Sequence, residues 1–184
     1  MKIYTRKGDD GTTGLLYGGR VSKRSVAIEL NGAIDEAQSA IGVVRAGSDD
    51  SELGPLCVHL ESDLWIVMAE VATLPSNRTK LVPGSSMVSS EMIEFLEHEI
   101  DHLSDLVEMP TEFVVPGETM TSARLDVART TVRRAERIAV DFVDEVHDSL
   151  VGAYLNRLSD LLWIMARWQE TTHLKVRDAE RKGY

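Results

Sequence analysis

The chain has 184 residues, a formal net charge of -10 and a hydrophobic content of 43%. This length fits one domain over residues 1–184, and the acidic balance argues against a nucleic-acid partner. A single cysteine, Cys57, excludes an internal disulfide framework and fits a reducing compartment. The N-terminus has no apolar signal core, and no apolar run is long enough to span a membrane. We therefore expect a cytoplasmic protein with no membrane partner.

Residues 1–25 show no helical period and combine five glycines with acidic, basic and threonine side chains. This composition predicts a loop with short extended pieces. The N–H groups of such a loop can converge on an anion, and threonine hydroxyls with Lys or Arg can complete a phosphate cradle. The segment matches neither a Walker A loop nor a Gly-x-Gly-x-x-Gly fingerprint. A flexible turn and a phosphate-binding loop therefore both remain open.

Five later segments place apolar residues at the three- and four-residue spacing of an amphipathic helix. The expected helices cover about 26–46, 51–74, 89–108, 119–144 and 149–170. The spacing leaves a loop over 75–88 and a polar tail over 171–184. Long helices with short connections predict an all-α, up-and-down five-helix bundle over residues 26–170.

The fourth expected helix carries Arg124, Arg129, Arg133, Arg134 and Arg137, which are five of the twenty Lys and Arg residues. Arg129, Arg133 and Arg137 are four residues apart, so they stack on one side of the helix, at the edge of its apolar face. Arginine binds phosphate and carboxylate groups through its planar fork. A solvated basic face or a set of structural ion pairs is the alternative. The glycine-rich loop elsewhere in the chain favours phosphate binding.

Two other patterns have ordinary structural interpretations. The run from His98 to His102 matches the spacing of a zinc protease motif. Both histidines project away from the apolar stripe of their helix, and a catalytic zinc needs a third ligand in a sheltered pocket, so we interpret them as a solvated face. Trp65, Trp163 and Trp168 are interpreted as packing residues.

Five motifs in the chain resemble, in order and spacing, those of the PduO-type ATP:corrinoid adenosyltransferases. The motifs are residues 4–15, 32–36, 113–117, 128–137 and 154–162. The similarity covers about residues 1–47 and 109–169, and the middle helices are generic. One departure is Tyr17, which stands where a glycine is common in this family.

The resemblance implies a five-helix bundle that assembles as a homotrimer, with active sites between subunits. It implies transfer of the 5′-deoxyadenosyl group of ATP to the cobalt of cob(I)alamin, which gives adenosylcobalamin and triphosphate. Magnesium would be bound through the ATP phosphates. An adenosylcobalamin-dependent enzyme that receives the product is a further candidate partner. Reduced cobalt is itself a strong nucleophile, so the protein need not supply one.

The resemblance also implies roles for individual residues. Arg133, Arg129, Asp35 and Phe113 would be the catalytic set, and Asp35 would pair with Arg129 across the subunit interface. Phe113 and Trp163 would line the corrinoid pocket, where the Phe113 ring excludes a lower axial ligand and leaves cobalt(II) four-coordinate and easier to reduce. The residues expected to bind ATP are Thr5, Arg6, Lys7, Gly8, Asp9, Asp10, Gly11, Thr12, Thr13, Gly14, Lys23, Arg133, Arg134, Glu136, Arg137 and Asn156.

Two alternatives belong to other functional classes. A bundle of this kind could bind ATP without turnover and act as a sensor or corrinoid carrier. A purely structural bundle would have no affinity for ATP. Release of triphosphate distinguishes the enzyme from both.

Overall fold

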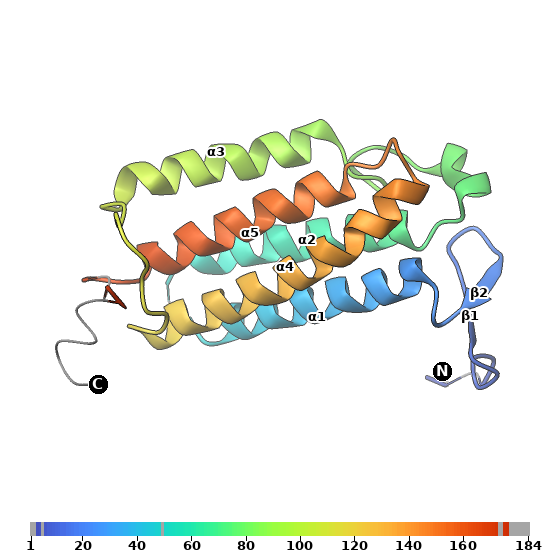
Figure 1. Ribbon diagram of the computed structural model, residues 1–184, viewed down its shortest axis with the longest axis horizontal. Coiled ribbons are helices and arrows are strands. Elements are labelled where there is room, and N and C mark those ends of the chain that lie inside the picture. The colour runs from blue at the N-terminus through green and yellow to red at the C-terminus, as the bar shows by residue number, and fades with distance from the viewer. Residues whose placement is uncertain (1–2, 5, 49, 173–174, 177–184) are drawn as a thin grey trace.

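The computed structural model describes residues 3–4, 6–48, 50–172 and 175–176. It is mostly helical (Figure 1). The α-helices are α1 (Val26–Ala46), α2 (Leu53–Val71), α3 (Ser90–Leu106), α4 (Met120–Glu145) and α5 (Val151–Trp168), and the 3-10 helix η1 covers Pro75–Lys80. The expected α-helices are confirmed. The expected loop over 75–88 is partly wrong, because η1 occupies its first half.

Consecutive α-helices run in opposite directions along the long axis of the bundle (Figure 1). Helix α1 packs against α2 and α4, α4 packs against α5, and α5 packs against α3. The predicted arginine helix α4 therefore has α1 on one side and α5 on the other. No helix in the described part of the chain is long and apolar enough to cross a membrane.

The buried faces of the helices follow the predicted apolar stripes. All six stripe residues of α4 are buried: Leu125, Ala128, Val132, Ala135, Ala139 and Phe142. Cys57 is free and buried in α2, as expected. Burial and the nearby Glu61 carboxylate raise the pKa of the Cys57 thiol to about 12. The thiol is therefore protonated at neutral pH and acts as a small core residue.

Two buried acids tie α2 to the rest of the bundle. Asp63 accepts a hydrogen bond at 3.0 Å from the Tyr154 hydroxyl on α5, and burial raises the pKa of the Asp63 carboxyl. Glu70 accepts hydrogen bonds from the Ser149 hydroxyl at 2.7 Å and from Arg78 at 3.1 Å. Buried carboxylates need such partners, so these contacts fix how α2 meets α5 and η1.

The N-terminal segment forms a small antiparallel hairpin of β1 (Thr12–Gly14) and β2 (Arg20–Ser22). These strands are the short extended pieces that the sequence predicts. The hairpin is attached to the bundle where the Leu16 N–H donates to the Ala72 carbonyl at 2.9 Å. In its turn Tyr17 has a φ of 62°, a left-handed conformation that favours glycine. This strain lies at the position where the sequence departs from the family pattern.

Candidate functional site

A cavity of about 920 Å³ lies where the segment before α4 passes the C-terminal half of α5. Phe113, Arg129 and Trp163 all line it, so the structure brings together three of the predicted site residues. The Phe113 side chain is 88% exposed. A large aromatic ring without packing of its own gains little for the fold. It is therefore free to contact a flat, apolar ligand.

The extended segment at Phe113 is held by the chain that follows α5. Val114 forms an antiparallel bridge with Lys175, and the Val176 N–H donates to the Phe113 carbonyl at 3.1 Å. Val176 also lines the cavity. The short extended piece predicted at Phe113 is confirmed, and its bridge partner Lys175 comes from the segment predicted as a polar tail.

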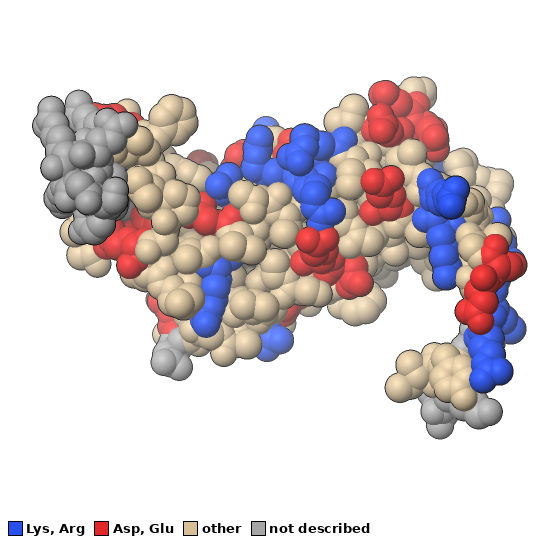
Figure 2. Space-filling view, turned by 60° about the horizontal axis from the view of Figure 1, so that its bottom comes forward, with Lys and Arg blue, Asp and Glu red and all other residues tan. Residues whose placement is uncertain are grey.

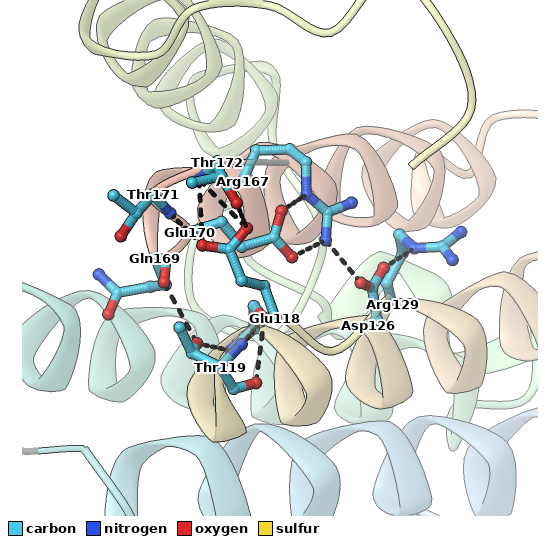
Figure 3. Close-up of polar contacts among 10 residues, drawn as sticks. Glu118, Thr119, Asp126, Arg129, Arg167, Gln169, Glu170, Thr171 and Thr172 are labelled. Carbon is cyan, nitrogen blue, oxygen red and sulfur yellow. Dashed lines mark hydrogen bonds and ion pairs between the residues drawn. The ribbon is translucent and has the colours of Figure 1, made fainter. Parts of the chain in front are cut away.

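Asp126, Arg129 and Arg167 line the cavity and belong to a polar network that Glu170 completes behind the cavity wall (Figure 3). Arg129 Nε donates to Asp126 Oδ1 at 3.0 Å, and Arg167 Nη2 donates to Asp126 Oδ2 at 2.7 Å. Arg167 Nε also donates to Glu170 Oε2 at 2.7 Å. Arg167 is 1% exposed, and its guanidinium lies 5.6 Å from the centre of the Trp163 ring.

Burial alone would lower the pKa of Arg167, but hydrogen bonds to Glu170 and Asp126 outweigh this effect and raise it. The guanidinium therefore stays charged in the interior, as expected for a buried arginine with two carboxylate partners. Asp126 is itself buried and shares its two oxygens between two arginines. The network thus places a fixed, charge-balanced pair of arginines beside an apolar cavity.

The start of α4 is tied to the end of α5 next to this network (Figure 3). The Thr119 hydroxyl donates to the Gln169 carbonyl at 3.2 Å. The Glu118 carboxylate accepts from the Thr171 N–H at 2.7 Å and the Thr172 N–H at 3.0 Å. Thr119 and Ser122 also form a reciprocal capping box on α4. These bonds fix the point at which the Phe113 segment enters α4.

A second cluster gathers four of the predicted ATP-binding residues on α4 and α5. Asn156 Nδ2 donates to Glu136 Oε1 at 2.8 Å, and Arg133 Nη1 lies 3.9 Å from Glu136 Oε2. Arg137 Nη1 donates to the Arg133 carbonyl at 3.0 Å. About half of the Arg133 side chain is exposed. Cations on an accessible helix face can bind an incoming polyanion, so this arginine cluster of Arg133, Glu136, Arg137 and Asn156 is suited to phosphate.

Arg134 points to a different partner. It forms an ion pair with Glu36 on α1, so it links the two helices within one chain. The Arg134 side chain is 43% exposed, and that of Glu36 is 57% exposed. An exposed ion pair of this kind contributes little to stability, and its guanidinium can exchange partners when a phosphate arrives.

The predicted ATP loop is ordered by its own hydrogen bonds. Asp10 Oδ1 accepts from the Thr12 N–H at 2.9 Å and the Thr12 hydroxyl at 2.7 Å, and these bonds lower the pKa of Asp10. Arg20 donates to the Thr12 hydroxyl at 2.6 Å. A Cβ on Gly8 would lie 3.1 Å from Lys23 Nζ, so the absence of a side chain lets this lysine approach the loop. Thr5 lies outside the described residues.

Basic side chains gather in two separate places on the face seen in Figure 2. One group lies in the middle of the bundle, and the other lies on the hairpin that projects at one end. The hydrogen bonds of Asp10, Thr12 and Arg20 stay inside the hairpin. Folding of one chain therefore does not join these three loop residues to the arginine cluster.

Asp35 lies on the exposed side of α1, while its predicted partner Arg129 pairs with Asp126 of the same chain. The expected contact between Asp35 and Arg129 runs between subunits, so it stays a prediction. His98 and His102 are exposed, which confirms their interpretation as a solvated face. In the described part of the chain, no three His, Cys, Asp or Glu side chains lie close enough to hold a metal ion.

Sequence reasoning missed the roles of Asp126, Arg167 and Glu170. The signal for Arg167 was present, because it is the only charged residue in the otherwise apolar run 161–168. A charge at such a place needs a buried partner. Its partner Asp126 is 41 residues away on another helix, and helical periodicity cannot identify a contact over that distance.

Comparison with known proteins places the chain in a family. A family model of cobalamin adenosyltransferases matches residues 3–169. A corrinoid adenosyltransferase of Citrobacter freundii is 39% identical over 173 residues, covering 93% of this chain and 96% of the relative. The corrinoid adenosyltransferase PduO of Salmonella typhimurium is 37% identical over 172 residues, and the match covers 93% of this chain but only 50% of that longer relative.

Solved structures give the same result. The chain superimposes on a phenylalanine-to-alanine variant of a PduO-type ATP:corrinoid adenosyltransferase from Lactobacillus reuteri, complexed with cobalamin and ATP. The TM-score is 0.80 at 26% identity, over 91% of this chain and 93% of that one. An arginine-to-lysine variant from the same organism, complexed with ATP, matches with a TM-score of 0.78. The chain belongs to the cobalamin adenosyltransferase family and, within it, to the PduO-type ATP:corrinoid adenosyltransferases.

Proposed function

We propose that the protein transfers the 5′-deoxyadenosyl group of ATP to the cobalt of cob(I)alamin. The observation that carries this proposal is the convergence of Phe113, Arg129 and Trp163 on one large, mostly apolar-walled cavity in a chain of this family. The relatives named above are corrinoid adenosyltransferases, and one structural neighbour holds both cobalamin and ATP.

In the proposed reaction the cobalt(I) electron pair attacks C5′ of ATP and forms the cobalt–carbon bond. The bond between C5′ and its oxygen breaks, and triphosphate leaves with that bonding pair. Cobalt is thereby oxidised formally from cobalt(I) to cobalt(III), with no further reductant. The protein has to hold C5′ in line with cobalt and to stabilise the departing triphosphate.

The chain offers two groups of cations for triphosphate. One is the arginine cluster on α4 and α5, with Arg133 half exposed next to Glu136. The other is the N-terminal loop, in which Lys23 approaches Gly8. Loss of one preorganised contact to the departing charge costs about 3 kcal/mol of barrier, or about a hundredfold in rate. Arg133 is the residue that we assign to this task.

The corrin ring would occupy the cavity with its lower face against Phe113. Because the Phe113 side chain is exposed, it can cover the lower face of cobalt without rearrangement of the core. An aromatic ring in that position supplies no lone pair to the metal. Cobalt(II) would then remain four-coordinate, and its reduction to cobalt(I) would become easier. Trp163 would form the adjoining wall.

We place the complete site between subunits of a homotrimer. Three observations support this arrangement. Asp35 is exposed on α1. Within the described part of the chain, Asp126 is the only hydrogen-bond partner of the Arg129 side chain. An apolar groove of about 510 Å³, lined by Val43 and Val127, lies open between α1 and α4. A second subunit there would let Asp35 meet Arg129 and would bring a loop to the arginine cluster.

Magnesium enters this proposal with ATP. Mg²⁺ is commonly held by phosphate oxygens and water with few protein ligands, and it neutralises part of the triphosphate charge. The donors present in this chain fit that mode, because the arginine cluster is predominantly cationic and contributes a single carboxylate, Glu136. The residues of the chain share the phosphate charge with the ion and do not need to enclose it.

Release of triphosphate tests the proposal against the carrier or sensor alternative. The protein is incubated anaerobically with ATP and magnesium, with and without cob(I)alamin, and inorganic triphosphate is measured by ion chromatography. The proposal predicts triphosphate in amounts equal to adenosylcobalamin, and none without the corrinoid. Binding of ATP without triphosphate release would contradict the enzyme and favour a carrier or sensor.

A further inference from the structure

Asp126 lies at the centre of the network in Figure 3 and has no role in the proposed function so far. Its two carboxylate oxygens are divided between two arginines: Oδ1 accepts from Arg129 Nε at 3.0 Å and Oδ2 from Arg167 Nη2 at 2.7 Å. Only 6% of Asp126 is exposed. Each oxygen of the carboxylate is therefore held by one arginine.

Arg167 provides the anchor. It is 1% exposed and donates to both Glu170 oxygens, at 2.7 and 2.8 Å. A buried guanidinium in a forked contact with one carboxylate has little rotational freedom. Because Arg167 cannot move, the oxygen of Asp126 that it holds cannot move either. The side chain of Glu170 is fully buried, so this anchor is shielded from competing water.

Arg129 is the accessible end of the network. Its side chain is 23% exposed and lines the cavity. Asp126 binds only Nε, and Figure 3 shows the two terminal nitrogens of Arg129 pointing away from Asp126. No hydrogen bond to these terminal nitrogens occurs among the residues that the structure describes. An arginine held at Nε keeps one orientation while its terminal fork stays available for another acceptor.

We propose that Asp126 is a positioning residue for Arg129: anchored by Arg167, it holds Nε and thereby aims the terminal guanidinium nitrogens for the corrinoid step. This inference rests on the proposed function, in which Arg129 belongs to the catalytic set. It assigns the buried Asp126–Arg167 pair a task in the reaction, beyond joining α4 to α5. Asp126 itself does not touch the reacting atoms.

Asp126→Asn and Glu170→Gln form a matched pair for the test. Each variant removes one of the two buried carboxylates that bind Arg167 and leaves the other to balance its charge. Only Asp126 also binds Arg129. A purely structural network predicts similar effects of the two substitutions. Positioning predicts the larger effect for Asp126→Asn, because Glu170→Gln loosens only the anchor and leaves Asp126 bound to Arg129 Nε.

The measurement is steady-state kinetics with cob(I)alamin and ATP varied separately. For Asp126→Asn we expect kcat/KM for cob(I)alamin to fall about tenfold to a hundredfold, with KM for ATP within about twofold of wild type. Glu170→Gln should lower kcat/KM for cob(I)alamin clearly less than Asp126→Asn does, and KM for ATP should stay near wild type. Equal losses in the two variants, or no loss in Asp126→Asn, would overturn the inference.

Arg129→Lys completes the test, because lysine keeps the charge but has no Nε–H to bind Asp126. If Asp126 acts through Arg129, Asp126→Asn causes no further loss in the Arg129→Lys background. A full additional loss would show that Asp126 acts by another route and would overturn the inference. Nitrogen-15 NMR gives a readout independent of turnover: the Arg129 Nε–H signal should be protected from exchange in wild type and Glu170→Gln, but not in Asp126→Asn.

Wild-type turnover tests the proposed function by itself; an inactive wild type would refute that function and this inference with it. An active wild type with unaffected variants would refute the inference alone. If Asp126→Asn does not fold, Arg167→Lys decides, because it keeps a buried cation but loosens the fork that anchors Asp126. It should lower the same parameter, and an unchanged value would overturn the inference.

Discussion

Asn156 on α5 donates a hydrogen bond to Glu136 on α4 at 2.8 Å, and this bond connects the arginine cluster to the neighbouring helix. The other end of the Asn156 amide accepts from Arg157 at 2.6 Å. The two contacts fix the orientation of the amide, because its nitrogen must face Glu136 and its oxygen must face Arg157. Glu136 in turn lies 3.9 Å from Arg133.

The first prediction concerns this amide. Asn156→Asp should place a carboxylate against that of Glu136 and weaken ATP binding, with KM for ATP rising about tenfold to a hundredfold, as typical for loss of a bond to a charged group. Asn156→Ala, which removes the bond without adding charge, should cause a smaller rise. Titration of ATP by calorimetry and kinetics checks both values. An unchanged KM in the aspartate variant would argue against Asn156 as an ATP-binding residue.

A pair of phenylalanines separates function from stability. Phe113 is 88% exposed and Phe142 is 3% exposed. Phe113→Ala should leave the free energy of unfolding within about 0.5 kcal/mol of wild type and should reduce corrinoid turnover. Phe142→Ala should cost about 3–5 kcal/mol of stability, because it leaves a cavity in the core. Urea denaturation and the turnover assay check the two. Full activity in folded Phe113→Ala would contradict its assignment to the corrinoid pocket.

Asp63 and Asp50 should respond to pH in opposite directions. Burial raises the pKa of Asp63 above its ordinary 3.8, so the folded protein favours the protonated carboxyl. The contribution of Asp63 to the stability of the fold therefore decreases as the pH rises from its ordinary pKa through its raised pKa. Asp63→Asn removes that penalty, and its free energy of unfolding relative to wild type should increase by about 1 kcal/mol between about pH 4 and about pH 7.5.

Asp50 is the control, because hydrogen bonds from the Leu53 and Glu52 N–H groups lower its pKa below 3.8. Its stabilisation is present above that value and is lost as the pH falls through the lowered pKa. Asp50→Asn should therefore be destabilising at neutral pH, and this cost should shrink in acid. Denaturant titrations across the pH range measure both variants. The same pH dependence in both would contradict these assignments.

Helical periodicity predicted the bundle well, because one apolar stripe per helix is enough to determine which face is buried. The bounds of α1 and every stripe residue of α4 are confirmed. The same reasoning was wrong for Trp65, which is 66% exposed. Trp65 lies beside the buried Leu64 in α2, and a large apolar side chain next to a stripe does not have to be part of it.

The sequence predicted the site residues that the family resemblance identifies. It did not predict contacts between side chains that are far apart in the sequence. The resemblance identified Phe113, Arg129 and Trp163, and the structure places them at one cavity. The Asp126–Arg167 contact depends on how α4 packs against α5, which local spacing does not specify. Contacts between subunits, such as that expected for Asp35, depend on a second chain and on neither local spacing nor the packing of one bundle.

The most direct test of the central claim is an anaerobic assay of the wild-type protein with ATP, magnesium and chemically reduced cob(I)alamin, followed by the absorption spectrum of the cobalamin. We predict conversion to the spectrum of adenosylcobalamin, and a loss of about a hundredfold or more in rate for Arg133→Ala with unchanged thermal stability. An unchanged cob(I)alamin spectrum in the presence of wild-type protein that still binds ATP would contradict the proposed adenosyl transfer.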